Sequence, residues 1–71
     1  MKEPKQIAYI YDKILADEET ELYLDGTVTV PVKGDTRQHG GKAWRVEHVT
    51  TDRSAPNALT IYCVYLKEVE N

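Results

Sequence analysis

The chain has 71 residues, with nine lysine and arginine side chains against twelve aspartate and glutamate side chains and a formal net charge of -3. This acidity argues against a general nucleic-acid-binding protein, because such a domain has an excess of basic residues. We expect a single domain over residues 1–71, which buries only about 60% of the surface that its unfolded form exposes. One cysteine excludes an internal disulfide, and two histidines with one cysteine fall short of a structural zinc site. We therefore expect self-association to supplement the core.

The first residues, MKEPKQ, lack the apolar run and the small-residue cleavage site of a secretory signal. The sequence also contains no run of about 18 consecutive apolar residues for a membrane span. An unpaired Cys63 fits a reducing compartment. We therefore expect a cytoplasmic protein with no membrane partner.

The segment IAYIYDKIL, residues 7–15, fits two interpretations. Its isoleucines, Tyr11 and Leu15 follow helical spacing. Isoleucine and tyrosine are nevertheless strand formers, and the DEET sequence that follows is typical of a hairpin tip. Residues 5–16 are therefore predicted as a strand, with a short N-terminal helix as the alternative.

Apolar and polar side chains alternate along ELYLDGTVTVPV, residues 21–32. The apolar residues at even positions are Leu22, Leu24, Val28, Val30 and Val32. A period of two is typical of a half-buried strand. A hairpin turn at Asp25-Gly26 would mix the apolar and polar faces, so we predict one long strand bent at Gly26. Pro31 indicates an edge position or a strand end.

The next strand is predicted from AWRVEHVTTD, residues 43–52. Trp44 and Val46 share a face, but Val49 has the opposite parity. Either a bulge near Glu47-His48 restores the phase, or His48 faces inward.

The last strand is predicted from ALTIYCVYLKEV, residues 58–69, after a loop at residues 52–57 that is rich in turn residues. Both of its faces are mostly apolar, with Leu59, Ile61, Cys63 and Tyr65 on one and Tyr62, Val64 and Leu66 on the other. Such a strand is covered on both sides, and a second subunit is the simplest cover, so we predict a homo-oligomer. The expected fold is all-β, a small antiparallel five-stranded barrel or rolled sheet.

The order of these features suggests a family. A Val/Pro-rich strand is followed by Gly34-Asp35, by the turn Gly40-Gly41, by Trp44-x-Val46-x-x-Val49 and by an apolar terminal strand. Over residues 28–67 this layout resembles small barrel-like proteins of tailed bacteriophages, which are similar to the Src-homology-type five-stranded barrel. Proteins of this kind include structural adaptors and counter-defence proteins that bind host factors or signalling nucleotides, so the resemblance implies a binding role.

Positive charge and glycine gather in KGDTRQHGGKAW, residues 33–44. Glycine can turn successive amide hydrogens toward a phosphate, arginine can bind a phosphate with two hydrogen bonds, and an aromatic ring can stack on a base. The predicted ligand-binding residues are Arg37, Lys42, Trp44 and Tyr23, supported by Lys33, His39, Gly40 and Gly41. In the alternative interpretation the glycines form a hairpin turn, the charges are solvated and Trp44 belongs to the core.

Three other features are given structural interpretations. His39 and His48 have no third ligand at a suggestive spacing, so no metal site is predicted. Cys63 lies in the apolar run IYCVY, where a thiol behaves as a small hydrophobe and not as a nucleophile. The acidic run at residues 17–21 is interpreted as like charges on a solvated turn.

No nucleophile with a base can be assembled from these motifs, so we expect a non-enzymatic protein without a cofactor. The leading hypothesis is a small-barrel binding protein of phage origin that sequesters a phosphate-bearing small molecule, such as a signalling nucleotide, as a counter-defence sponge. The alternative is a protein–protein interaction module, either a phage structural adaptor or an inhibitor that docks on a host protein through a sheet edge or an acidic face.

Overall fold

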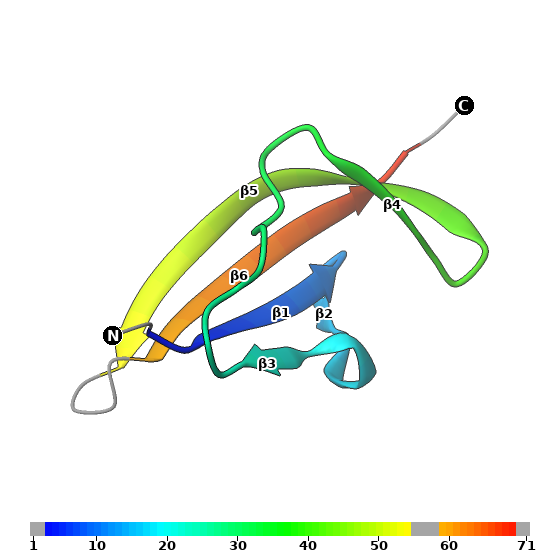
Figure 1. Cartoon of the computed structure of the whole chain (residues 1–71). Helices are drawn as coiled ribbons and strands as arrows, with labels where there is room; N and C mark the ends of the chain where they lie inside the picture. Colours follow the sequence, from blue (N-terminus) through cyan, green and yellow to red (C-terminus); the bar gives the residue numbers. More distant parts are fainter. Residues whose placement is uncertain (1–2, 55–58, 70–71) are drawn as a thin grey trace.

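The computed structural model describes residues 3–54 and 59–69, which are mostly strand (Figure 1). The elements are β1 (Lys5–Tyr11), β2 (Ile14–Leu15), the 3-10 helix η1 (Asp17–Glu19), β3 (Glu21–Tyr23), β4 (Thr36–His39), β5 (Lys42–Ser54) and β6 (Leu59–Glu68). They form one sheet in the order β2-β1-β6-β5-β4, and β3 also pairs with β1. The all-β prediction is confirmed. No helix in the described ranges is long and apolar enough to cross a membrane.

Residues 5–16 contain two strands and no α-helix, so the helical alternative is wrong. β1 follows a period of two, and its side chains Ile7, Tyr9 and Tyr11 all pack in or against the core. Tyr11 pairs with Ile14 across a tight turn into β2. Strand propensity and pairing with β6 therefore outweigh the helical spacing of the isoleucines.

The sheet is mixed, and its backbone ladder is not closed. β1 and β6 run parallel, from the Lys5–Thr60 pair to the Tyr11–Leu66 pair, whereas β5 and β6 are antiparallel. Within the described part of the chain, β4 pairs with β5 alone and does not reach the opposite margin of the sheet. The antiparallel barrel of the sequence prediction is therefore not confirmed.

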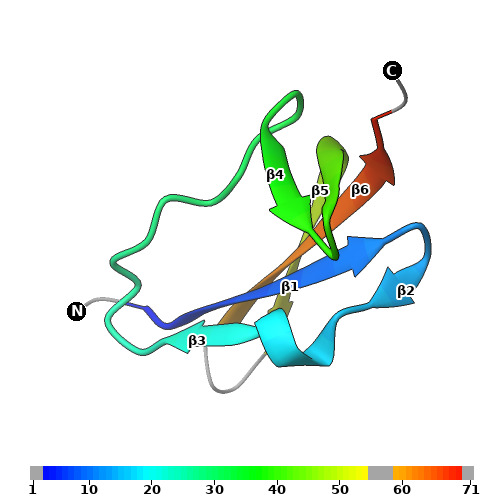
Figure 2. The same cartoon turned by 90° about the vertical axis from the view of Figure 1, so that its right-hand side faces the viewer.

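The core lies on one face of the sheet. Its buried members are Ile7, Tyr11, Ala16, Trp44, Val46, Val64 and Leu66. The segment at residues 24–35 lies on the same side as this core (Figures 1 and 2), and its residues Val28 and Val30 pack against it. Burying apolar area on this face is the main favourable term for so short a chain.

A bulge in β5 keeps its apolar residues on the core face. The register with β6 shifts between Val46 and His48, so Trp44 and Val46 are buried and Val49 also packs against the core. His48 faces away from the core and stacks on Tyr65, with 4.4 Å between the ring centroids. The bulge interpretation is confirmed.

The prediction of one long strand at residues 21–32 is wrong. β3 ends at Tyr23, where the carbonyl oxygen accepts a hydrogen bond of 3.1 Å from the amide of Gly26. Gly26 has a φ of 70°, and the Asp25 carboxylate accepts a hydrogen bond of 2.9 Å from the amide of Thr27. Aspartate and glycine thus form a turn with local hydrogen bonds, which competes with strand pairing.

The alternating residues around this turn therefore do not share one buried face. Leu22, Leu24 and Val32 are exposed, whereas Val28 and Val30 are partly buried. The loop predicted at residues 52–57 is wrong for residues 52–54, because β5 continues through Ser54; residues 55–58 lie outside the described ranges. The last strand, β6, lies within the predicted residues 58–69.

Replacing Ile7 with alanine should destabilise the fold severely. The side chain is 1% exposed, and such a truncation costs about 2–5 kcal/mol, out of on the order of 5–10 kcal/mol for a domain of this size. Urea unfolding measures the change. Leu24→Ala is the control, since Leu24 is 75% exposed and should change the free energy of unfolding by less than about 0.5 kcal/mol. Equal effects of the two substitutions would contradict the assigned core.

Candidate functional site

The carboxylate of Glu19, at the end of η1, connects the two margins of the sheet. Its Oε1 accepts hydrogen bonds from the Tyr11 hydroxyl, at 2.5 Å, and from Arg37 Nη2, at 3.2 Å. Its Oε2 contacts Nδ1 of His39. Tyr11 belongs to β1, whereas Arg37 and His39 belong to β4, and Figure 2 shows β4 and η1 facing each other across the open side of the sheet. We name Glu19, Arg37, His39 and Tyr11 the Glu19 clasp.

Aromatic rings of β1 and β5 hold Arg37 and His39 of β4. The Arg37 guanidinium lies 3.8 Å from the centroid of the Tyr9 ring, a cation–π contact. The His39 ring stacks on Tyr11, with centroids 3.8 Å apart and planes inclined by 9°. Trp44 meets Tyr11 edge to face and donates a hydrogen bond of 3.0 Å to the carbonyl oxygen of His39. These contacts fix β4 over the core face of the sheet.

The Glu19 clasp is held together by charge. Burial by itself raises the pKa of Glu19, but hydrogen bonds from Tyr11 and His39 and the charges of His39 and Arg37 outweigh it and lower this pKa below its usual 4.5. Burial, together with the hydrogen bond to Glu19, raises the pKa of Tyr11. Glu19 is therefore ionised at neutral pH and neutralises charge on β4 from within the protein.

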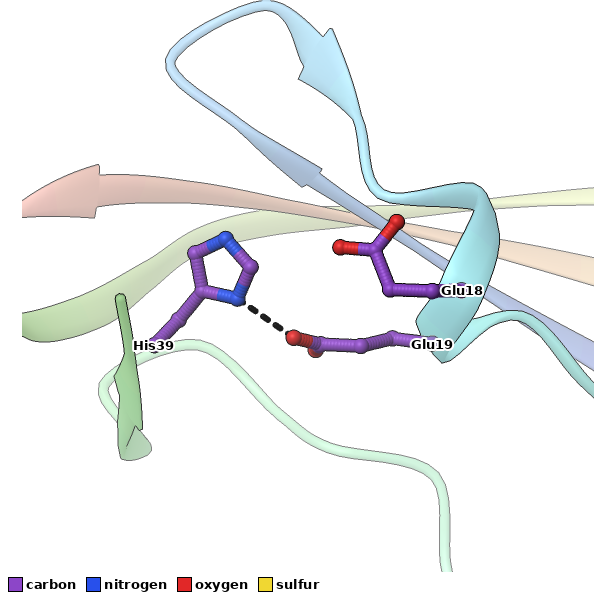
Figure 3. A group of neighbouring side chains, drawn as sticks. All are labelled: Glu18, Glu19 and His39. Carbon is purple, nitrogen blue, oxygen red and sulfur yellow. Dashed lines mark hydrogen bonds and ion pairs between the residues drawn. The ribbon is translucent and has the colours of Figure 1, made fainter. Parts of the chain in front are cut away.

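Glu18, Glu19 and His39 each offer one potential metal-ligand atom, and these atoms lie within 4.8 Å of one another (Figure 3). Two carboxylates and an imidazole are ligands that Zn²⁺ accepts. Glu19, however, already accepts hydrogen bonds from Arg37 and Tyr11, which a cation would have to displace. The geometry favours an internal ion-pair cluster, and the absence of a metal site stays a prediction.

Three of the predicted ligand-binding residues have structural roles. Trp44 is buried in the core, as the alternative interpretation of the sequence expected. Gly40 and Gly41 form the two-residue turn between β4 and β5, with φ values of 61° and 77°. Positive φ at both central positions is what a type I′ hairpin turn requires.

Two further predicted residues contact carboxylates: Tyr23, which is partly buried against the core, and Lys42, which is exposed. The Tyr23 hydroxyl donates a hydrogen bond to Glu21, which raises the pKa of Tyr23. Lys42 forms an exposed ion pair of 3.4 Å with Glu68. The predicted cluster is thus divided: Arg37 and His39 belong to the Glu19 clasp, and Tyr23 lies on β3. Lys42 begins β5 opposite His39 and pairs with Glu68 at the end of β6.

A groove of about 640 Å³ lies away from the Glu19 clasp, beside the bulge of β5. Three cationic residues line it, namely Lys33 of the predicted set and two others, Arg45 and Lys67. Arg45 and Lys67 are directly opposite each other in the β5–β6 ladder. No ion pair among residues 3–54 and 59–69 involves any of these three cations. We name the space between them the cationic groove.

The cationic groove also contains acidic groups. Glu68 lines it, but its charge is balanced by Lys42. Glu47, the residue at the register shift of β5, contributes a second carboxylate, and His48 adds an imidazole. With three cations against Glu47 alone, the groove has a net positive charge in an acidic chain.

Strand parity could have identified the two cations that the sequence analysis missed. Arg45 lies between the buried residues Trp44 and Val46, so its side chain points to the face opposite the core. Lys67 follows the buried Leu66 and points the same way. The β5–β6 register that sets Arg45 opposite Lys67 could not be predicted from the sequence, because it depends on the bulge in β5 and on the connection between the two strands.

The sequence predicts a solvated turn for the acidic run at residues 17–21, but Glu19 does not fit this prediction. Glu18 is exposed as expected, but the Glu19 side chain is only 23% exposed and is bound by three side chains. No local pattern marks Glu19 among its acidic neighbours, because its partners come from β1 and β4.

Glu19→Gln should lower the free energy of unfolding by about 1 kcal/mol at pH 7, since the group is partly exposed and loses its charge toward Arg37. The folded pKa lies below the ordinary 4.5, so the contribution of ionised Glu19 is complete above that value and is lost as the pH falls through the folded pKa. Urea unfolding at pH 7 and at pH 3 should show a smaller difference between wild type and variant at pH 3.

The exposed neighbour Glu18 is the control, and Glu18→Gln should leave unfolding unchanged at both pH values. A Glu19→Gln effect of the same size at pH 7 and pH 3 would show that the carboxylate charge does not hold the Glu19 clasp together.

Comparison with known proteins gives no match: no family model, no curated protein and no solved structure matches the chain. The resemblance to small phage barrels over residues 28–67 therefore stays a prediction.

Proposed function

We propose that the protein is a non-enzymatic binding protein that holds a phosphate-bearing small molecule in the cationic groove. The observation that supports this most is the direct opposition of Arg45 and Lys67 in the β5–β6 ladder. Like charges directly opposite each other destabilise an antiparallel pair by a few tenths of a kcal/mol up to about 1 kcal/mol. An anion between the two side chains removes that repulsion and gains two charge-assisted hydrogen bonds.

Lys33 supplies the third cation from a different direction. It belongs to the segment before β4, where the Gly34 amide donates a hydrogen bond of 3.0 Å to the carbonyl oxygen of Val46. This bond holds the segment against the edge of β5, next to Arg45 on the same strand. The three cations thus approach the groove from a loop and two strands, an arrangement that suits the several oxygens of a phosphate.

The Glu19 clasp explains why the groove is the better candidate than the glycine-rich turn. Arg37 and His39 already have Glu19 as a partner, so an external phosphate there competes with an internal carboxylate. Lys33, Arg45 and Lys67 have no such competitor in ion-pair contact within the described ranges. Binding in the groove therefore gains more electrostatic free energy than binding at β4.

Binding without chemistry is supported by the groups that line the groove. They are ammonium, guanidinium and carboxylate groups with the imidazole of His48, and the only thiol in the sequence, Cys63, is not among them. No hydroxyl or thiol nucleophile of the described residues therefore lies beside a base in the groove.

Arg45→Gln should weaken binding of adenosine diphosphate and of inorganic pyrophosphate by about tenfold or more, because a charged hydrogen-bond donor is lost. Titration calorimetry at low salt measures the affinities. Arg53→Gln is the matched control, since Arg53 lies on the same strand but pairs with Glu3 at 2.6 Å. Equal weakening by both substitutions would indicate a general charge effect, and undetectable binding by the wild type would contradict the proposal.

Lys67→Glu should change the stability and the ligand affinity of the protein in opposite directions. It converts a like-charged cross-strand pair with Arg45 into an oppositely charged one, so the ligand-free protein should gain up to about 1 kcal/mol of stability. The same substitution should abolish pyrophosphate binding. Urea unfolding and calorimetry measure the two effects; a variant that loses stability, or that binds pyrophosphate as well as the wild type does, would contradict the role of this pair.

A further inference from the structure

The face of the sheet opposite the core carries mostly apolar side chains on β1, β2, β3 and β6 and polar side chains on β5. The pairing registers place three rows on it, and Ala8, Cys63 and Thr50 form the central row. On one side of it lies the row of Leu15, Ile10, Tyr65 and His48, and on the other side lies the row of Leu22, Gln6, Ile61 and Asp52. We name these three rows the outer face.

The outer face has no layer over it in the described part of the chain. Ala8 is buried, but no residue of the outer face belongs to the core cluster or packs against it. Leu15 and Leu22 are about half exposed, and Ile10, Ile61, Cys63 and Tyr65 are only partly buried. A contiguous apolar surface of this kind on a small protein marks an interaction site.

We propose that a second copy of this chain covers the outer face, with the strands of the two copies antiparallel and a two-fold axis along the central row. This axis exchanges the two outer rows, so the row of Tyr65 in one copy faces the row of Ile61 in the other. Face-packed sheets lie about 10 Å apart with aligned strands, which this arrangement satisfies.

The side chains on the outer face are self-complementary about this axis. Tyr65 of one copy faces Ile61 of the other, and Leu15 faces Leu22, so large apolar groups meet at two positions of each outer row, while Ile10 faces Gln6. The small residues Ala8 and Cys63 lie on the axis, where identical residues must face each other. A central row of small residues leaves room for the larger groups on either side to interdigitate.

Charge complementarity points to the same orientation. Asp52 ends one outer row and His48 ends the other, so the antiparallel arrangement sets the carboxylate of each copy opposite the imidazole of its partner. The cations Arg45 and Lys67 lie one row beyond His48, and their field adds to the attraction of Asp52. A two-fold axis along β6 would instead make the strands parallel and set Asp52 opposite Gln6, which carries no charge.

Sedimentation of the ligand-free protein tests the interface without reference to the cationic groove. Wild type should sediment as a dimer, and Ile61→Lys should raise the dimer dissociation constant at least tenfold because it places a charge in the apolar face. Leu24→Lys is the matched control, since Leu24 is exposed and lies outside the outer face. Far-ultraviolet circular dichroism confirms that each variant is folded. A monomeric wild type, or an Ile61→Lys variant that dimerises as well as the control, would overturn the proposal.

A charge exchange tests the orientation. Asp52→Lys should weaken the dimer, and adding His48→Glu to it should restore dimerisation, because the two positions face each other across the axis. A bismaleimide with a reach of about 10 Å should also cross-link Cys63 to the partner's Cys63, the spacing expected for packed sheets. No recovery in the double variant, or no cross-link in a proven dimer, would overturn the antiparallel arrangement.

Discussion

The structure depends on β6, which is paired along its length on both sides. It runs parallel to β1 and antiparallel to β5, and these two ladders make up most of the sheet. One face of β6 supplies Val64 and Leu66 to the core, whereas the other supplies Ile61, Cys63 and Tyr65 to the outer face. A chain of this length has only enough apolar residues for one core layer, so a strand with two apolar faces leaves one of them uncovered.

The Glu19 clasp decides which basic residues of the sheet remain available to a ligand. Because the sheet does not close through backbone hydrogen bonds, its two margins are held together by the Glu19 carboxylate and by the rings that Arg37 and His39 contact. This structural use of Arg37 and His39 removes them from the set of residues that is available to a ligand. Two other strand cations, Arg45 and Lys67, face away from the core and lie at one end of the outer face, so the groove and the proposed interface are neighbours.

Much of the fold could be predicted from strand periodicity, and the failures have local causes. The bulge in β5 followed from the opposite parity of Trp44 and Val49, because a buried face tolerates no slip of one residue. The long strand at residues 21–32 failed because Asp25 and Gly26 form a turn whose hydrogen bonds alternation does not reveal. For the site, charge and glycine density pointed to residues 33–42. Strand pairing instead set Arg45 opposite Lys67, and chain folding brought Glu19 to Arg37.

The sequence by itself determined the strand content, the two-faced character of the last strand and the glycine turn before β5. Each of these follows from side chains within a few residues of one another, through the period of two and the backbone freedom of glycine. Only the tertiary structure decided the parallel β1–β6 pairing, the partners of Glu19 and the opposition of Arg45 and Lys67. These contacts join residues far apart in the chain, and their register depends on loop lengths and on packing against the core, which no local pattern encodes.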